Sequence, residues 1–225
     1  MAGYDSLKNK QAELIRKALD GSVFVADLSA DPIAELTTAT GVAPDVTIDL
    51  SPLPTDWDDL GWLTDDGAQF ERDSSSSEIS SWGSVTPTRT DVVSDTSTLT
   101  VTAQETKLLT IGLATGADLA NLTPDPDTGE LSIAKPARPK SKHYRVLSLA
   151  VDEGEAGEIY IARFLPRAKV NSYAAQSFSK GDEPITWGVT LVGEEDSDLG
   201  YSERWIFGGP GWQALLADMG FTVTP

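Results

Sequence analysis

The stretch TLTVTAQ, residues 98–104, alternates hydroxyl or amide side chains with apolar ones at every position. Successive side chains of a β-strand point to opposite faces, so this period of two predicts a half-buried strand. The odd-numbered side chains, Leu99, Val101 and Ala103, are expected to face a core. The even-numbered side chains are expected to face water or a partner. The stretch therefore favours a domain built on β-sheet.

Strand-like stretches recur along the rest of the chain, separated by turns that contain Pro or Gly. The run 107–113 suits a short helix or a strand, and 212–219 suits a terminal helical turn or two. With 225 residues, the chain has the size of one ordinary domain. We therefore expect a mainly β domain with one or two small helices. Its further strands are expected at residues 23–28, 144–151, 159–165, 185–192 and 204–207.

The run SSSSEISSW, residues 74–82, has the spacing of a strand but is polar on both faces. A strand of this kind has no strong register of its own and relies on its neighbours. Two interpretations stay open. The run is either a flexible Ser-rich loop or a strand wetted on both sides, as in a hairpin that lines an aqueous channel.

The N-terminal segment, residues 4–19, has the pattern of an amphipathic helix that ends at Gly21. Its basic side chains would lie on the exposed face, either in water or against another, acidic subunit. Prolines interrupt residues 31–57, which predicts a long loop or arm there. The expected organisation is therefore a helical arm at 1–21 and a β domain at 22–225 that carries this loop.

Negative charge is the most unusual property of the composition. The chain has 17 Lys and Arg against 35 Asp and Glu, a formal net charge of −18. Residues 20–105 hold most of the excess, because Arg72 and Arg89 are their only basic residues. Such a surface repels phosphate groups, which argues against a sequence-reading nucleic-acid binder and against a partner of anionic membranes.

The residue types that catalysis and metal binding most often need are scarce. The chain has no cysteine and one histidine, His143, so thiolate chemistry and Cys- or His-rich metal sites are excluded. Paired acids such as Asp65 and Asp66 are typical of solvated loops. We expect no enzyme activity, no cofactor and no metal. No apolar run has the length of a signal peptide or a membrane span, so folding in the cytoplasm is expected.

Several short motifs occur in an order that resembles one protein family. Residues 60–67 read LGWLTDDG, Trp82 and Gly83 end the serine run, and residues 86–90 read TPTRT before the alternating strand. Later motifs are FLPRA at 164–168 and FSKGD at 178–182. Over about residues 57–193 the chain resembles the major tail tube protein of long-tailed, non-contractile (siphovirus-type) phages, particularly actinobacteriophages.

This resemblance implies a β-sandwich or small barrel with one flanking α-helix, a core shared with the tube protein of type VI secretion. It implies hexameric rings that stack into a tube for the ejection of double-stranded DNA. The implied partners are other copies of the chain, the tape measure protein and the tail tip and tail terminator proteins, with no membrane. The implied location is the virion, and the host cytoplasm during assembly.

The resemblance also suggests which residues face the channel and which face other subunits. Glu78, Asp91 and Asp95 are candidates for the lumen, where negative charge would keep DNA from binding. The strands around residues 74–82 and 98–104 are expected to join those of neighbours into one closed barrel. The candidates for subunit contacts are Lys8, Arg16, Lys17, Val101, Lys135, Arg138, Lys140, Lys142 and Arg145.

Two other classes of protein fit parts of the sequence. A secreted or surface-exposed β-sandwich adhesion protein would also have Thr- and Ser-rich strands and high acidity, although it would need an export signal. An acidic hydrolase would need two carboxylates that converge in a pocket. Rings or tubes in electron microscopy would support the tube protein, isolated monomers that bind glycans the adhesion protein, and substrate turnover the hydrolase.

Overall fold

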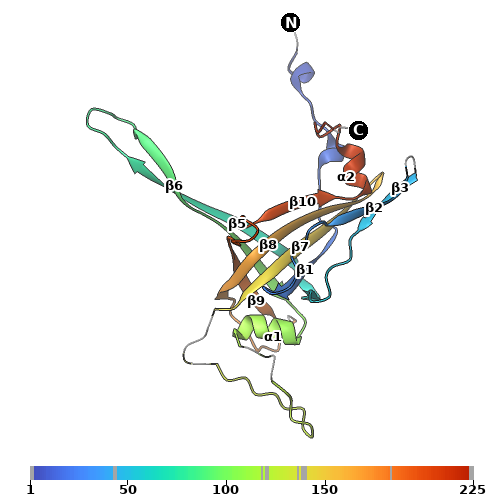
Figure 1. Ribbon diagram of the computed structural model, residues 1–225, viewed down its shortest axis with the longest axis vertical. Helices are drawn as coiled ribbons and strands as arrows, with labels where there is room; N and C mark the ends of the chain where they lie inside the picture. The colour runs from blue at the N-terminus through green and yellow to red at the C-terminus, as the bar shows by residue number, and fades with distance from the viewer. Residues whose placement is uncertain are drawn as a thin grey trace.

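Antiparallel strands dominate the computed structural model, which describes residues 3–42, 45–117, 119, 122–135, 137, 141–182 and 184–222 (Figure 1). The strands are β1 (Asp20–Asp27), β2 (Thr37–Val42), β3 (Asp45–Leu50), β4 (Asp58–Asp59), β5 (Leu63–Ile79), β6 (Arg89–Ala103), β7 (His143–Gly154), β8 (Gly157–Tyr173), β9 (Trp187–Glu194) and β10 (Arg204–Gly208). The helices are α1 (Leu108–Thr115) and α2 (Pro210–Leu215). The protein is mainly β, and every strand expected from the sequence is present.

The main sheet has the strand order β4-β1-β7-β8-β9-β6-β5, and β10 pairs with β8 outside this path. The length of β8 makes both pairings possible. Its N-terminal half pairs with β10, while its C-terminal half, from Arg167 to Tyr173, pairs with β9. The sheet therefore divides along β8, and β9, β6 and β5 form a second layer.

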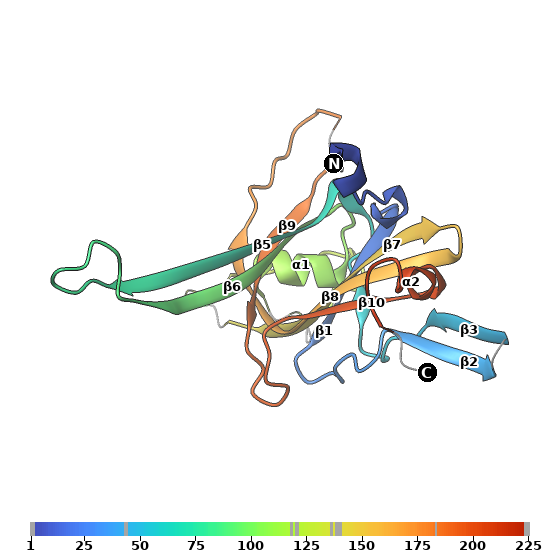
Figure 2. The same ribbon diagram turned by 90° about the horizontal axis from the view of Figure 1, so that it is seen from above.

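Two apolar clusters fill the spaces on the two faces of β1, β7 and β8. In β1, Val23 and Val25 belong to the cluster shared with β6, β9 and α1, whereas Phe24 and Ala26 contact the other cluster. In β8, Leu165 belongs to the first cluster. Because both faces of these strands are covered, the arrangement is a β-sandwich, and α1 packs against its first apolar cluster (Figure 2).

The alternating stretch 98–104 lies in β6, and its odd-numbered side chains are buried as expected. The run that suited helix or strand is the helix α1. Thr110 fixes its first turn, because its Oγ1 accepts a hydrogen bond from the Lys107 N–H and donates one to the Glu105 carbonyl. Gly116, in the left-handed region at φ 64°, ends the helix.

The prediction of an N-terminal α-helix is wrong. Residues 4–19 contain two short 3₁₀ turns, Tyr4–Leu7 and Ala12–Leu14, and are otherwise extended. Most apolar side chains on the expected apolar face stay exposed, including Leu7 at 75% and Ile15 at 76%. An amphipathic helix of this length depends on burial of its apolar face, and no described residue covers this one. The segment is an extended arm, drawn in dark blue in Figure 1.

Residues 31–57 also differ from the expected loop. Their middle forms the separate β2–β3 hairpin, and their two flanks pack into the second apolar cluster. Ile33, Leu36 and Trp57 are buried there, and the Trp57 indole N–H donates to the Asp31 carbonyl at 3.1 Å. The prolines exclude a helix, as expected, but they do not prevent the side chains between them from packing.

The hairpin of β5 and β6 extends far beyond the body of the protein (Figures 1 and 2). We call residues 72–97 the hairpin arm. None of them belongs to either apolar cluster, and Ser74 to Ile79 are exposed on both faces. Of the two interpretations of the serine run, the structure therefore has the strand wetted on both sides, up to Ile79.

Candidate assembly surfaces

A polar face covers the outside of the layer formed by β5, β6 and β9. Thr98 and Thr100 lie on it, opposite to the buried face of Leu99, and the hydroxyl groups of Thr100 and Thr190 hydrogen bond across β6 and β9 at 3.0 Å. The register places Gln69 beside Thr100 and Glu71 beside Thr98 on the same face. We call this surface the hydroxyl face; it offers hydroxyl, amide and carboxylate groups to whatever it meets.

The three lumen candidates do not share one face of the hairpin arm. Asp95 lies opposite Ser74, and Glu78 follows Ser74 at even spacing along β5, so both are on the side that continues the Leu99 face. Asp91 lies opposite Ser77 and, because of a bulge at Ser75 and Ser76, on the side that continues the hydroxyl face. Sequence alternation alone missed this division because it cannot show a bulge.

Two of these acids have partners within the chain. Asp91 accepts a hydrogen bond from Arg89 Nε at 2.7 Å, and Asp95 is paired with Arg72 across the arm. The hydrogen bond from the Arg72 guanidinium holds the pKa of the Asp95 carboxyl below its ordinary value. Glu78 has no ion pair among the described residues, so it contributes an uncompensated negative charge.

An arginine fixes the base of the hairpin arm to the body. The Arg163 guanidinium lies 3.8 Å from the ring centroid of Phe70 in β5 and 4.2 Å from that of Trp205 in β10. Arg163 also pairs with Glu203, which accepts a hydrogen bond of 2.6 Å from Ser97. Both charged side chains are nearly buried, and their contacts hold the base of the hairpin arm against β8 and β10.

Three basic residues expected at subunit contacts bind within their own chain. Arg145 is nearly buried; it pairs with Asp196 at 3.2 Å and donates to the carbonyls of Leu28, Ala30 and Pro166. Arg16 pairs with Asp152 at 3.3 Å, and Lys142 pairs with Asp27 at 2.7 Å. For Arg145 the predicted subunit contact is wrong, since its side chain is nearly buried and bonded within its own chain.

Replacing Arg145 with Met is expected to lower the free energy of unfolding by about 3–5 kcal/mol, because Asp196 would be left buried and unpaired. The matched control is Lys135→Met, since Lys135 is exposed and has no charged partner among the described residues. Urea unfolding of both variants measures the difference. A loss below about 1 kcal/mol for Arg145→Met would contradict the structural role given to this residue.

The other contact candidates divide by exposure. Val101 is buried in the first cluster, so the core assignment is confirmed and the predicted subunit contact at this residue is wrong. Lys8 pairs with Asp5 near the end of the extended N-terminal arm, and the side chains of Lys17 and Lys135 are exposed. Arg138 and Lys140 lie outside the described residues.

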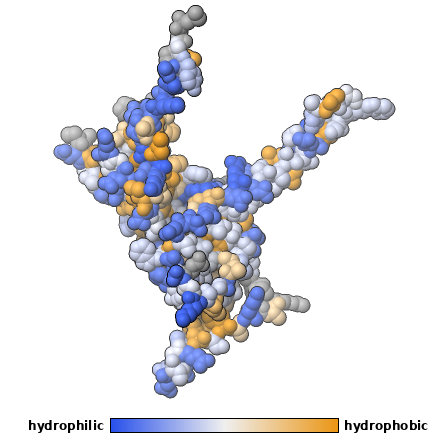
Figure 3. All heavy atoms as spheres, turned by 180° about the vertical axis from the view of Figure 1, so that it is seen from behind, coloured by the Kyte–Doolittle hydropathy of each residue, from blue (hydrophilic) through white to orange (hydrophobic). Residues whose placement is uncertain are grey.

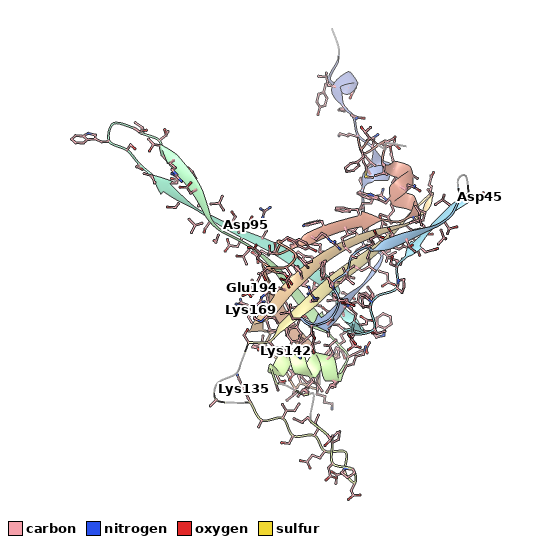
Figure 4. All side chains as sticks on the ribbon, in the orientation of Figure 1. Asp45, Asp95, Lys135, Lys142, Lys169 and Glu194 are labelled. Atoms are coloured by element: carbon pink, nitrogen blue, oxygen red, sulfur yellow. The ribbon has the colours of Figure 1, made fainter. Side chains whose placement is uncertain are left out.

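A charged cluster that sequence reasoning missed surrounds Glu194 at the end of β9 (Figure 4). Lys169 pairs with Glu194, His143 Nε2 lies 3.0 Å from Glu194 Oε2, and Arg167 lies 3.5 Å away. The hydrogen bond from Lys169, followed by that from His143, lowers the pKa of the Glu194 carboxyl. The four residues come from three neighbouring strands, so no local motif could have indicated them.

Lys169→Met is expected to raise the pKa of Glu194 toward its ordinary value, as measured by NMR titration of the carboxyl group. A carboxyl whose pKa is lowered by folding adds stability above its unfolded pKa and loses it as the pH falls through the folded pKa. The variant should therefore show a weaker loss of stability on acidification. An unchanged Glu194 pKa would contradict the assignment of Lys169 as its main partner.

The described residues form no group of three or more His, Asp and Glu side chains that could hold a metal ion. In the same part of the chain, no helix is long and apolar enough to cross a membrane. The notable surfaces are instead those that another protein chain could contact: an open strand edge, a projecting hairpin and an extended N-terminal arm.

A family model described as phage tail tube protein matches residues 8–192. The matched range includes the hairpin arm, the hydroxyl face and the buried residues of both apolar clusters. No curated protein matches the chain.

Proposed function

Since the chain belongs to the phage tail tube protein family, we propose that its copies assemble into hexameric rings that stack into the tube of a long, non-contractile tail. The coarser role follows from the family: the chain is a structural protein of the phage tail. The assignment to siphovirus-type phages of actinobacteria is supported by the motifs at residues 60–67 and 178–182.

The observation that carries the proposal is the open edge of β5. This strand has 17 residues and pairs with β6 on one side, while no described residue pairs with its other side. Such an edge is a ready template for another strand. Joining of this edge to the sheet of a neighbouring copy would close a barrel around a channel, and closure removes the exposed edges.

The hydroxyl face is the surface we assign to the lumen. The opposite face of the same layer is occupied by the core and by α1, so it cannot line a channel. Hydroxyl and carboxylate groups bind phosphates weakly, whereas a lysine- or arginine-lined passage would hold DNA in a salt-dependent manner. The channel would therefore let DNA pass without specific binding.

Other tail proteins would contact only the ends or the interior of such a tube. We propose the tape measure protein as the interior partner before ejection, and the tail tip and tail terminator proteins as end partners. Assembly would take place in the host cytoplasm, before the tube becomes part of the virion.

Negative-stain electron microscopy and sedimentation of the purified, concentrated protein test this proposal. The expected result is rings or tubes with a central hole wide enough for a DNA duplex. A protein that stays monomeric over the whole concentration range and binds glycans would instead support the adhesion alternative and contradict the tube.

A further inference from the structure

A row of stacked aromatic rings runs along β10 and α2. The ring centroids of Trp205 and Phe207 are 6.2 Å apart, those of Phe207 and Trp212 are 4.8 Å apart, and those of Trp212 and Phe221 are 6.3 Å apart. We call these four residues the aromatic ladder. It begins beside Arg163, at the base of the hairpin arm, and leads away from the arm toward α2 (Figure 1).

The aromatic ladder is open to solvent. Trp205, Phe207 and Phe221 are 54%, 41% and 56% exposed. The strand that carries the first two, β10, pairs with β8 on one side and with no described strand on the other. Several large apolar side chains in one contiguous row are unusual on a monomer surface and mark contact sites.

The tip of the hairpin arm is a second uncovered apolar surface. Trp82 and Val85 are fully exposed, and Ile79, Val92 and Val93 along the same arm are more than half exposed. Figure 3 shows orange, hydrophobic patches between hydrophilic ones along the projecting hairpin. A two-stranded ribbon with so much exposed apolar surface is marginally stable unless it is covered. The arm leads away from its own body, so it cannot cover its own ladder.

We propose that the hairpin arm of one copy, with Trp82 and Val85 near its tip, docks on the aromatic ladder of a second copy. This inference rests on the proposed function and names the surfaces of one subunit contact. The contact is heterologous, because each copy offers the arm at one place and the ladder at another. Contacts of this kind generate closed rings or open filaments rather than simple dimers.

Charge favours this pair of surfaces. Two copies that each carry −18 repel one another, so surfaces that meet must be neutral or opposite in charge. Residues 79–88 at the arm tip include no charged residue, and neither do residues 205–217, which carry three of the four rings of the aromatic ladder. These two segments can therefore approach each other without desolvating or opposing like charges.

The surface area that the aromatic side chains could bury fits a contact at the centre of a larger interface. A buried aromatic side chain contributes about 150–250 Å². Three exposed ladder rings and Trp82 thus bring several hundred Å², less than the roughly 1,600 Å² of a standard interface. The strands of the arm would add the remainder, and the aromatic residues would be its hot spots.

Cross-linking tests the contact directly, because the natural chain has no cysteine. Val85→Cys and Gln213→Cys place single thiols at the exposed arm tip and on α2 beside Trp212. Mixed in equal amounts, assembled and treated with a short bis-maleimide, they are expected to form cross-linked dimers. Val85→Cys mixed with Lys135→Cys, which lies far from the ladder, is the matched control and should give at least tenfold less product.

The outcomes separate this inference from the proposed function. Tubes that form without Val85–Gln213 cross-links, or that cross-link Val85 to Val85 instead, overturn the contact and leave the tube standing. Failure of the wild-type chain to assemble at all overturns both. A second test uses Trp82→Ser and Phe207→Ser: each variant alone should lose tubes, while their mixture should form short complexes through the intact arm of one and the intact ladder of the other.

Discussion

Removal of the hairpin arm is expected to abolish polymerisation while the monomer stays folded. In the variant, residues 75–94 are replaced by Asn-Gly, which forms a two-residue turn between Ser74 and Asp95, partners in the native register. The removed residues lie outside both apolar clusters, so the free energy of unfolding should change by less than about 1 kcal/mol. Sedimentation should show monomers at concentrations at which the wild-type chain forms tubes.

The matched control keeps the arm but alters its surface. Ser75→Ala with Ser94→Ala removes the hydrogen bond of 2.6 Å between the two hydroxyl groups and leaves the strands in place. This variant should assemble like the wild-type chain. Tubes of normal length from the shortened variant would show that the arm has no part in assembly.

Charge reversal on the hydroxyl face is expected to slow DNA ejection strongly without preventing assembly. Glu71 and Asp73 lie opposite Thr98 and Thr96, so both belong to the hydroxyl face. In a phage that carries Glu71→Lys and Asp73→Lys, each ring would present new cations to the DNA backbone. Ejection should slow by about tenfold or more at low salt, where phosphate attraction is least screened, and recover as salt is added.

Glu78→Lys with Asp95→Lys is the matched control, because it makes the same change in charge on the opposite side of the hairpin arm. Adsorption should be normal in both phages, since exposed charges alter stability little. If the control slows ejection more than the Glu71 and Asp73 variant does, the lumen lies on the other side of the arm. The original candidates Glu78 and Asp95 would then be the lumen residues.

The strands were predictable because alternation indicates burial of one face and a short apolar run indicates burial of both. Leu99, Val101 and Ala103 are buried for the reason that the alternation indicates. The N-terminal segment shows where such patterns fail. It has the spacing of an amphipathic helix, but such a helix also needs a surface against which Leu7 and Ile15 can pack. The spacing carries no information about that surface, and both side chains are exposed.

The assembly surfaces were only partly predictable. The alternation in residues 98–104 predicted which side chains face away from the core, and these threonines lie on the hydroxyl face. Arg145 closes a basic run, which predicts a surface position, whereas its partners Leu28, Pro166 and Asp196 are distant in the sequence. The aromatic ladder was missed because its rings come together only when α2 folds back on β10.

Cryo-electron microscopy of the assembled protein would show directly which face of the layer of β5, β6 and β9 lines the hole. We expect a tube with six copies in each ring, in which Thr98, Thr100 and Thr190 face the lumen and α1 lies outside the barrel. A tube whose lumen is lined by α1 or by β10, or a concentrated protein that forms no tube, would contradict this expectation.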